Sequence, residues 1–148
     1  MKTLIVLSVL LAVASAEILT RCQTAKAIKN SVLAKYTKYK VADWVCLIKH
    51  ASNYNSFAVG HDSKDGKSFS TNYGLFQISS KWWCNNGKTP NSSNGCGIQC
   101  TELMSDNLQA SINCASTIVA QKGMEAWSSW VENCMGKWIN YYTYFCDL

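Results

Sequence analysis

Eight cysteines constrain this chain more than any other feature of its sequence. They are Cys22, Cys46, Cys84, Cys96, Cys100, Cys114, Cys134 and Cys146. An even number of cysteines behind an export signal indicates four disulfides, although the sequence by itself allows many different pairings. A zinc site does not explain them, because the spacing of Cys96 and Cys100 has no matching histidine or second cysteine pair.

Residues 1–16 have the organisation of a secretory signal peptide. Lys2 supplies the positive start, residues 4–13 are apolar, and Ala14-Ser15-Ala16 is a small-residue cleavage site. The apolar run is about half of the ~20 residues that a membrane span requires, so we expect no retained transmembrane anchor. We predict that residues 17–148 form one domain that is secreted to the extracellular space.

The charge of the chain narrows its possible partners. It carries 14 Lys and Arg against 9 Asp and Glu, a formal net charge of +5, without any block of like charge. A nucleic-acid-binding tail is therefore excluded, whereas the modest positive charge favours anionic partners such as bacterial surfaces. We expect a monomer.

The hydrophobic pattern predicts an α+β protein. Apolar residues recur at helical spacing in residues 25–35, and Asp43 is placed to cap a second helix. Asp65-Gly66 is a turn signal between short strands. After a polar loop, helical spacing returns in residues 103–119 and 124–130. A small β lobe thus interrupts the helices, and we expect a ligand cleft between the two lobes.

Several segments resemble one family of proteins over essentially all of residues 17–148. The chain is similar to the C-type lysozymes and α-lactalbumins, glycoside hydrolase family 22, in the segments Asp43-Trp44-Val45-Cys46, Thr71-Asn72-Tyr73-Gly74-Leu75-Phe76-Gln77-Ile78, Lys81-Trp82-Trp83-Cys84-Asn85, Ser111-Ile112-Asn113-Cys114-Ala115 and Gly123-Met124-Glu125-Ala126-Trp127. The resemblance implies a lysozyme-like fold, with a helical lobe, a small antiparallel β lobe and four disulfides. It also implies the pairings Cys22–Cys146, Cys46–Cys134, Cys84–Cys100 and Cys96–Cys114.

The two positions that hold catalytic carboxylates in the active members of that family are occupied by Ala51 and Asn72. Lysozyme is the type case of a mechanism in which one carboxyl group donates a proton and a second, ionised one stabilises or attacks the sugar cation. Ala51 is fixed in register by Cys46, and Asn72 by Tyr73-Gly74 and Cys84. Neither residue supplies a proton or a negative charge. We therefore predict no catalytic residues and a protein without muramidase activity.

Other ionisable side chains near these two positions are candidate substitutes for the missing carboxylates. His50 is adjacent to Ala51, but consecutive side chains on a helix point about 100° apart, so we expect it to face away. His61, Asp62 and Asp65 follow in a polar segment, where we interpret them as turn residues that are able to reach the cleft.

The resemblance implies that the saccharide-binding residues are largely kept. They are Trp82, Trp83, Trp127, Gln77 and Ala126. Indole rings stack on pyranose faces, and adjacent exposed tryptophans indicate a binding surface. Two positions depart from the family pattern. Ser79 stands where the family usually has an asparagine that contacts the N-acetyl group, and Gln121 or Lys122 occupies a stretch that often holds an acidic sugar contact. Trp44 and Trp130 are interpreted as core residues.

The remaining predictions concern metals, modification and function. We expect no cofactor and no metal, because an α-lactalbumin-like calcium site needs clustered oxygen ligands and residues 101–111 contain only Glu102 and Asp106 as acids. Asn91-Ser92-Ser93 is a candidate glycosylation site.

The leading hypothesis is a secreted, catalytically inactive lysozyme-like protein. It would bind N-acetylglucosamine-containing glycans, such as peptidoglycan or chitin, in defence, innate immunity or recognition. Three alternatives stay open. They are a weakly active lysozyme using a loop acid such as Asp65, a cationic antimicrobial that does not hydrolyse glycans, and a regulatory partner like α-lactalbumin.

Overall fold

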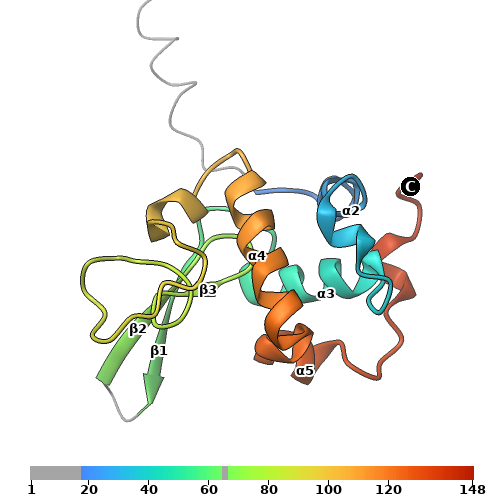
Figure 1. The fold of residues 1–148 in the computed structure, drawn as a ribbon. Coiled ribbons are helices and arrows are strands. Elements are labelled where there is room, and N and C mark those ends of the chain that lie inside the picture. Colours follow the sequence, from blue (N-terminus) through green and yellow to red (C-terminus); the bar gives the residue numbers. More distant parts are fainter. Residues whose placement is uncertain (1–17, 65–66) are drawn as a thin grey trace, which may run out of the picture.

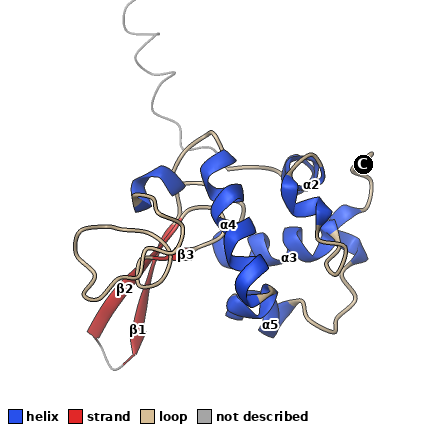
Figure 2. Ribbon diagram, viewed as in Figure 1, coloured by secondary structure: helices blue, strands red, loops and turns tan. Residues whose placement is uncertain are grey.

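The computed structural model describes residues 18–64 and 67–148, so the predicted signal peptide and the predicted turn at Asp65-Gly66 lie outside the described residues. Within these described ranges, four α-helices, several short 3-10 helices and a three-stranded antiparallel sheet make up the regular structure (Figures 1 and 2). The helices are α2 (Arg21–Lys29), α3 (Val41–Ser52), α4 (Gln109–Lys122) and α5 (Ser128–Asn133). This arrangement confirms the α+β lysozyme-like architecture expected from the sequence.

The first helical segment is divided in two, where the periodicity of residues 25–35 predicted one helix. Helix α2 begins after Thr20, whose side chain accepts from the Gln23 N–H in a reciprocal capping box. It ends at Asn30, and a separate 3-10 helix, Val32–Lys35, follows. The Ser31 hydroxyl donates to the Ile28 carbonyl and accepts from the Leu33 N–H. Its competition with the helical ladder explains the break.

Helix α3 carries Ala51 in its last turn. Asp43 caps the start of this helix from a different position than the sequence predicted. The helix starts after Lys40, so Asp43 is its third residue and not the N-cap. The Asp43 carboxylate accepts the Lys40 N–H at 2.8 Å and the Trp130 indole N–H at 3.0 Å. The carboxylate therefore still stabilises the helix start and also ties α3 to α5.

The β lobe is an antiparallel sheet of β1 (Val59–Lys64), β2 (Lys67–Tyr73) and β3 (Ile78–Ser79), in that order. Val59 pairs with Tyr73, and Asn72 pairs with Ser79. A bulge between Asp62 and Ser63 shifts the register toward the hairpin tip. The hairpin is the small β lobe that the sequence predicted.

The helices that follow the sheet begin and end at different residues than the predicted ranges 103–119 and 124–130. Residues 100–103 form a 3-10 helix, Cys100–Leu103, and α4 begins only at Gln109. A 3-10 helix, Met124–Ala126, precedes α5, and Trp127 joins them in extended conformation. A last 3-10 helix, Asn140–Thr143, lies in the C-terminal segment. The extended backbone at Trp127 directs its indole into the space between the lobes.

A continuous core joins the helices to the sheet. Trp44 is fully buried and makes edge contacts with Tyr39, Phe76 and Trp127, at ring-centroid distances of 6.5, 6.0 and 5.7 Å. Trp130 is also buried, so both core tryptophans are confirmed. Such edge-on aromatic contacts stabilise a core beyond the area they bury.

The four disulfides follow the pairing that the family resemblance implies: Cys22–Cys146, Cys46–Cys134, Cys84–Cys100 and Cys96–Cys114. Two of them close long loops, with sequence separations of 124 and 88 residues. In the chain-entropy account a bridge of that span contributes about 4–5 kcal/mol to stability. Within the described ranges, no helix is long and apolar enough to cross a membrane.

Candidate functional site

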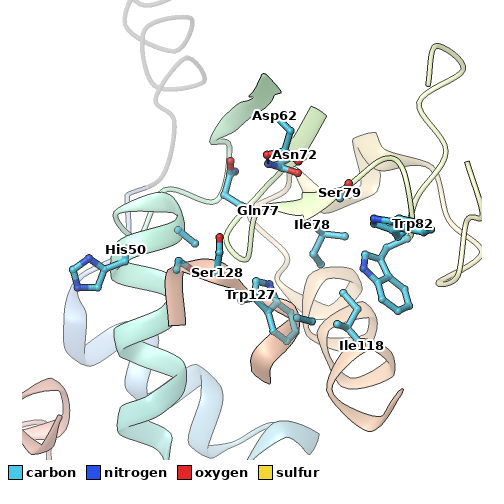
Figure 3. Close-up of a pocket in the computed structure, with 14 residues that line it drawn as sticks. His50, Asp62, Asn72, Gln77, Ile78, Ser79, Trp82, Ile118, Trp127 and Ser128 are labelled. Carbon is cyan, nitrogen blue, oxygen red and sulfur yellow. Dashed lines mark hydrogen bonds between the residues drawn. The ribbon is translucent and has the colours of Figure 1, made fainter. Parts of the chain in front are cut away.

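A cleft of about 360 Å³ separates the sheet from the helical lobe (Figure 3). Its walls come from the end of α3, the facing strands β1 and β2, the loop after β3, and the segment that leads into α5. The residues that line it include Ala51, Asp62, Asn72, Gln77, Ile78, Ser79, Trp82, Trp83, Ile118, Ala126 and Trp127. The cleft brings together Ala51, Asn72, the candidate substitutes His50 and Asp62, and all the predicted saccharide-binding residues, whereas His61 does not line it, and Gln121 and Lys122 line a neighbouring cavity.

Ala51 lies on the helical wall of the cleft, at the position where the family resemblance expects a catalytic acid. Ala51 is half-buried against the core at the end of α3. Its neighbour His50 is exposed, and its Nε2 lies 3.3 Å from the Tyr142 hydroxyl. In Figure 3 the imidazole points away from Asn72 and Trp127. Burial, followed by the charges of Lys49 and Lys137, lowers the pKa of His50. The ring is therefore mostly neutral at pH 7 and does not replace the acid.

The sheet wall contains a carboxylate that reasoning from the sequence had assigned to a turn. Asp62 lies on β1, and its Oδ1 accepts a hydrogen bond from Asn72 Nδ2 at 3.1 Å. Its Oδ2 accepts from the Ser70 hydroxyl at 3.2 Å. Strand residues alternate between faces, and the antiparallel register makes residues 62 and 72 diagonal neighbours on the face that lines the cleft. The turn interpretation of Asp62 is thus wrong.

Of the other two proposed substitutes, the structure describes only His61, which does not reach the same place. His61 points to the opposite face of the strand from Asp62, and its Nδ1 lies 3.5 Å from the Thr71 hydroxyl. Asp65 lies outside the described residues. Asp62 is consequently the acidic residue among those that line the described cleft.

The aromatic residues of the cleft differ in how firmly they are held. Trp127 is only 7% exposed, and its indole N–H donates to the Phe76 carbonyl at 2.9 Å. Trp83 is half-buried. Trp82 is 53% exposed, with the Lys81 ammonium 5.0 Å from its ring centroid. The three indoles form a graded surface, rigid at the centre and open at the rim.

Gln77 and Ala126 also line the cleft, but their N–H groups are already used. Gln77 Nε2 donates to the Ala58 and Gly74 carbonyls, both at 3.0 Å, across a backbone with a φ of 49°. The Ala126 N–H donates to the Gly123 carbonyl at 3.3 Å. Gln77 therefore fixes the loop before β3. Because the N–H groups of Gln77 and Ala126 are engaged, their oxygen atoms remain as hydrogen-bond acceptors for a ligand.

A second, more apolar cavity of about 410 Å³ adjoins the cleft at Trp82 and Trp83. Ser93, Gly95, Gln121, Lys122 and Ala126 complete its lining. A side chain at Gly95 would bring a Cβ within 2.7 Å of the Trp83 ring. Gly95 thus allows the Trp83 indole to lie against the backbone, a requirement that no local pattern in the sequence indicates.

The structure bears on the predictions about metal binding and glycosylation. Among residues 18–64 and 67–148, no group of three or more His, Cys, Asp or Glu side chains is arranged to hold a metal ion. Asn91 is exposed on the loop between Cys84 and Cys96, with a φ of 56°. Its glycosylation stays a prediction.

Comparisons with known proteins agree on one family. The family model described as the C-type lysozyme/alpha-lactalbumin family matches residues 17–146. Lysozyme C, tracheal isozyme, of Bos taurus is 43% identical over 150 residues, covering 100% of both chains. Lysozyme C-2 of Mus musculus is 42% identical over 151 residues with the same coverage. Lysozyme C of Chelonia mydas is 43% identical over 129 residues, 86% of this chain and 97% of the relative.

Proposed function

The chain belongs to the C-type lysozyme/alpha-lactalbumin family, and from that premise we propose that it is a secreted protein that binds N-acetylglucosamine-containing glycans without cleaving them. The observation that carries this proposal is Ala51 at the end of α3, in a cleft whose aromatic walls are intact. Peptidoglycan or chitin fragments, met in a defence or recognition setting, are the ligands that suit it.

The case against ordinary hydrolysis is chemical. Breaking a glycosidic bond requires a proton for the leaving oxygen and stabilisation of the sugar cation. A methyl group at Ala51 donates no proton, and the neutral amide of Asn72 carries no charge. A positioned general acid typically contributes about 10²–10⁴ in rate. Removing it should leave muramidase activity near background.

The case for retained binding rests on Trp82, Trp83 and Trp127. Pyranose rings stack on indole faces, and the exposed Trp82 with the half-buried Trp83 presents such faces at the rim. We assign the Ala126 carbonyl to accept the N–H of an N-acetyl group, since its own N–H is engaged within the turn. Ser79 and Lys122 at the two cavities are expected to alter which sugars fit.

Binding is tested directly by titrating chitotriose and following tryptophan fluorescence and heat. We expect saturable binding at millimolar or lower ligand, and a loss of at least about tenfold in affinity for Trp82→Ala. Val32→Ala, an exposed apolar residue outside the cleft, is the matched control and should bind normally. No saturable signal at millimolar chitotriose would sink the glycan-binding proposal.

The inactivity is tested by restoring the family carboxylates. The double variant Ala51→Glu, Asn72→Asp should gain lysis of bacterial walls over the parent chain, which should show none above background. Substantial lysis by the parent would overturn the proposal of inactivity. If the double variant shows no lysis although it still binds chitotriose, the cleft holds glycans in a different register.

Asp62 favours a second candidate, a glycosidase of low activity. Its carboxylate faces the cleft and is hydrogen-bonded to Asn72, so it is placed to stabilise a sugar cation without a proton donor. Such a site would hydrolyse only substrates whose leaving group needs no protonation. Turnover of nitrophenyl chitobioside that disappears in Asp62→Asn, while chitotriose binding persists, would establish this candidate in place of the inactive one.

A further inference from the structure

Exposed aromatic side chains gather in the C-terminal segment, away from the cleft. More than half of the large hydrophobic residues that are exposed in the described ranges lie in residues 135–148. We use the term C-terminal aromatic surface for Trp138, Tyr141, Tyr144 and Phe145. Trp138 is 68% exposed and Phe145 is 95% exposed. Monomeric secreted proteins rarely present a contiguous apolar patch unless it contacts another surface.

The surface is held in place by the fold. Cys134 and Cys146 bracket the segment and bridge to α3 and α2 respectively. The buried Ile139 anchors it between the two bridges. The rings also support one another, with centroid distances of 5.7 Å for Trp138–Tyr144 and 6.2 Å for Tyr144–Phe145. The exposed rings are therefore a fixed feature of this segment.

The backbone at Phe145 adds to the argument for a function. Its φ is 60°, in the left-handed region that an aromatic residue rarely adopts. A phenylalanine that is strained and almost fully solvated contributes little to the stability of the fold. The backbone strain and the exposure of an apolar ring are both explained if the Phe145 ring contacts an external partner.

Basic residues lie beside part of the same surface. The Arg21 guanidinium lies 5.1 Å from the Tyr141 ring centroid and donates to the Tyr141 carbonyl at 3.0 Å. Lys137 precedes Trp138. Lys29 and Lys40 line a hollow with Asn140, Thr143 and Leu148 of the same C-terminal segment, although none of the four rings lines that hollow. Asp147 and Glu132 are the nearby acids along the chain, so the described cations beside this segment, Arg21, Lys29, Lys40 and Lys137, outnumber them.

We propose that the C-terminal aromatic surface docks on an anionic lipid bilayer. Tryptophan and tyrosine rings suit the boundary between headgroups and acyl chains, and a protruding phenylalanine inserts deeper. The neighbouring Arg and Lys side chains would pair with anionic headgroups. A second copy of this chain is a poorer occupant, because the same cations would face one another. The C-terminal segment lies at the opposite end of the molecule from the sheet, so docking would leave the cleft open (Figure 1).

The proposal is tested by sedimentation with vesicles of phosphatidylcholine mixed equally with phosphatidylglycerol, against phosphatidylcholine alone. We expect binding to the anionic vesicles, weakened by salt, and a blue shift of tryptophan fluorescence. The double variant Trp138→Ser, Phe145→Ser should lower vesicle affinity by about tenfold or more. Phe57→Ser, at an exposed phenylalanine before β1, is the matched control and should leave vesicle binding unchanged.

Three results would overturn the proposal. One is the absence of binding to anionic vesicles by the parent chain. Another is equal binding by the parent and the double variant, which would show that net charge alone attracts the protein. The third is a dimer in sedimentation equilibrium that dissociates in the double variant, which would assign the surface to a second copy. Because both substituted side chains are exposed, the variant should fold, and unchanged circular dichroism checks this. Chitotriose binding is scored separately, so neither proposal depends on the other.

Discussion

The helical wall and the sheet wall of the cleft present different kinds of side chain to the same space. The helical wall is built on the core: Trp127 is buried against Trp44, and Ala51 continues that apolar surface. The sheet wall is polar, with Ser70 and Asn72 both donating to the exposed Asp62. Alanine at position 51 fits the packing of the helical wall, whereas the sheet wall carries the carboxylate of Asp62. A substitution should therefore disturb packing in the helical wall and hydrogen bonds in the sheet wall.

The largest effect should come from removing the centre of the helical wall. Trp127→Ala deletes a buried indole and its hydrogen bond to Phe76, so we expect a loss of about 3–5 kcal/mol in the free energy of unfolding. Trp82→Ala, on an exposed ring, should cost less than about 1 kcal/mol. Urea unfolding followed by circular dichroism measures both. Equal losses would show that the cleft is not anchored by this wall.

A smaller effect should follow from adding a charge to the sheet wall. Asn72→Asp replaces the donor to Asp62 with a second carboxylate, and the lost hydrogen bond and repulsion should cost about 1–2 kcal/mol at pH 7. Because the folded variant takes up a proton to relieve the repulsion, its unfolding free energy should rise as the pH falls toward 5. Urea midpoints across that pH range test the sign.

The double variant Asn72→Asp, Asp62→Asn is the control for that experiment. It exchanges the two side chains and restores one donor and one acceptor across the strands. Its stability at pH 7 should return close to that of the parent. A continued loss would mean that the orientation of the pair, and not its charge, maintains the sheet wall.

The smallest effect concerns His50, at the solvent end of the helical wall. Burial holds its pKa below the ordinary histidine value of 6.5, so the folded protein binds fewer protons there than the unfolded chain. The His50 contribution to stability is thus present above pH 6.5 and is lost as the pH falls below it. His50→Gln should flatten this slope in urea midpoints measured between about pH 7 and pH 5. An unchanged slope would assign the pH dependence to other groups.

Much of the architecture followed from the sequence because it depends on local or covalent features. The cysteine count predicted four bridges, and the family resemblance implied the pairing that the structure has. The position of Ala51 followed from its spacing to Cys46. The turn interpretation of Asp62 failed because strand register, which is not local, places this residue on β1. The two helix starts and ends that were misplaced are ones where a side chain forms a local hydrogen bond that competes with or caps the helix. Ser31 interrupts a periodic helix, and Asp43 caps from inside its helix.

The sequence by itself determined the fold class, and it predicted Ala51 and Asn72 at the positions where the family resemblance expects carboxylates, because both depend on which residues stand at fixed distances from cysteines and tryptophans. Only the tertiary structure decided that Asp62 joins Asn72 and that the aromatic residues near Cys146 remain exposed. Strand register brings residues ten positions apart onto one face, and burial depends on what the rest of the chain covers. Both are properties of the packed molecule that no short stretch of sequence contains.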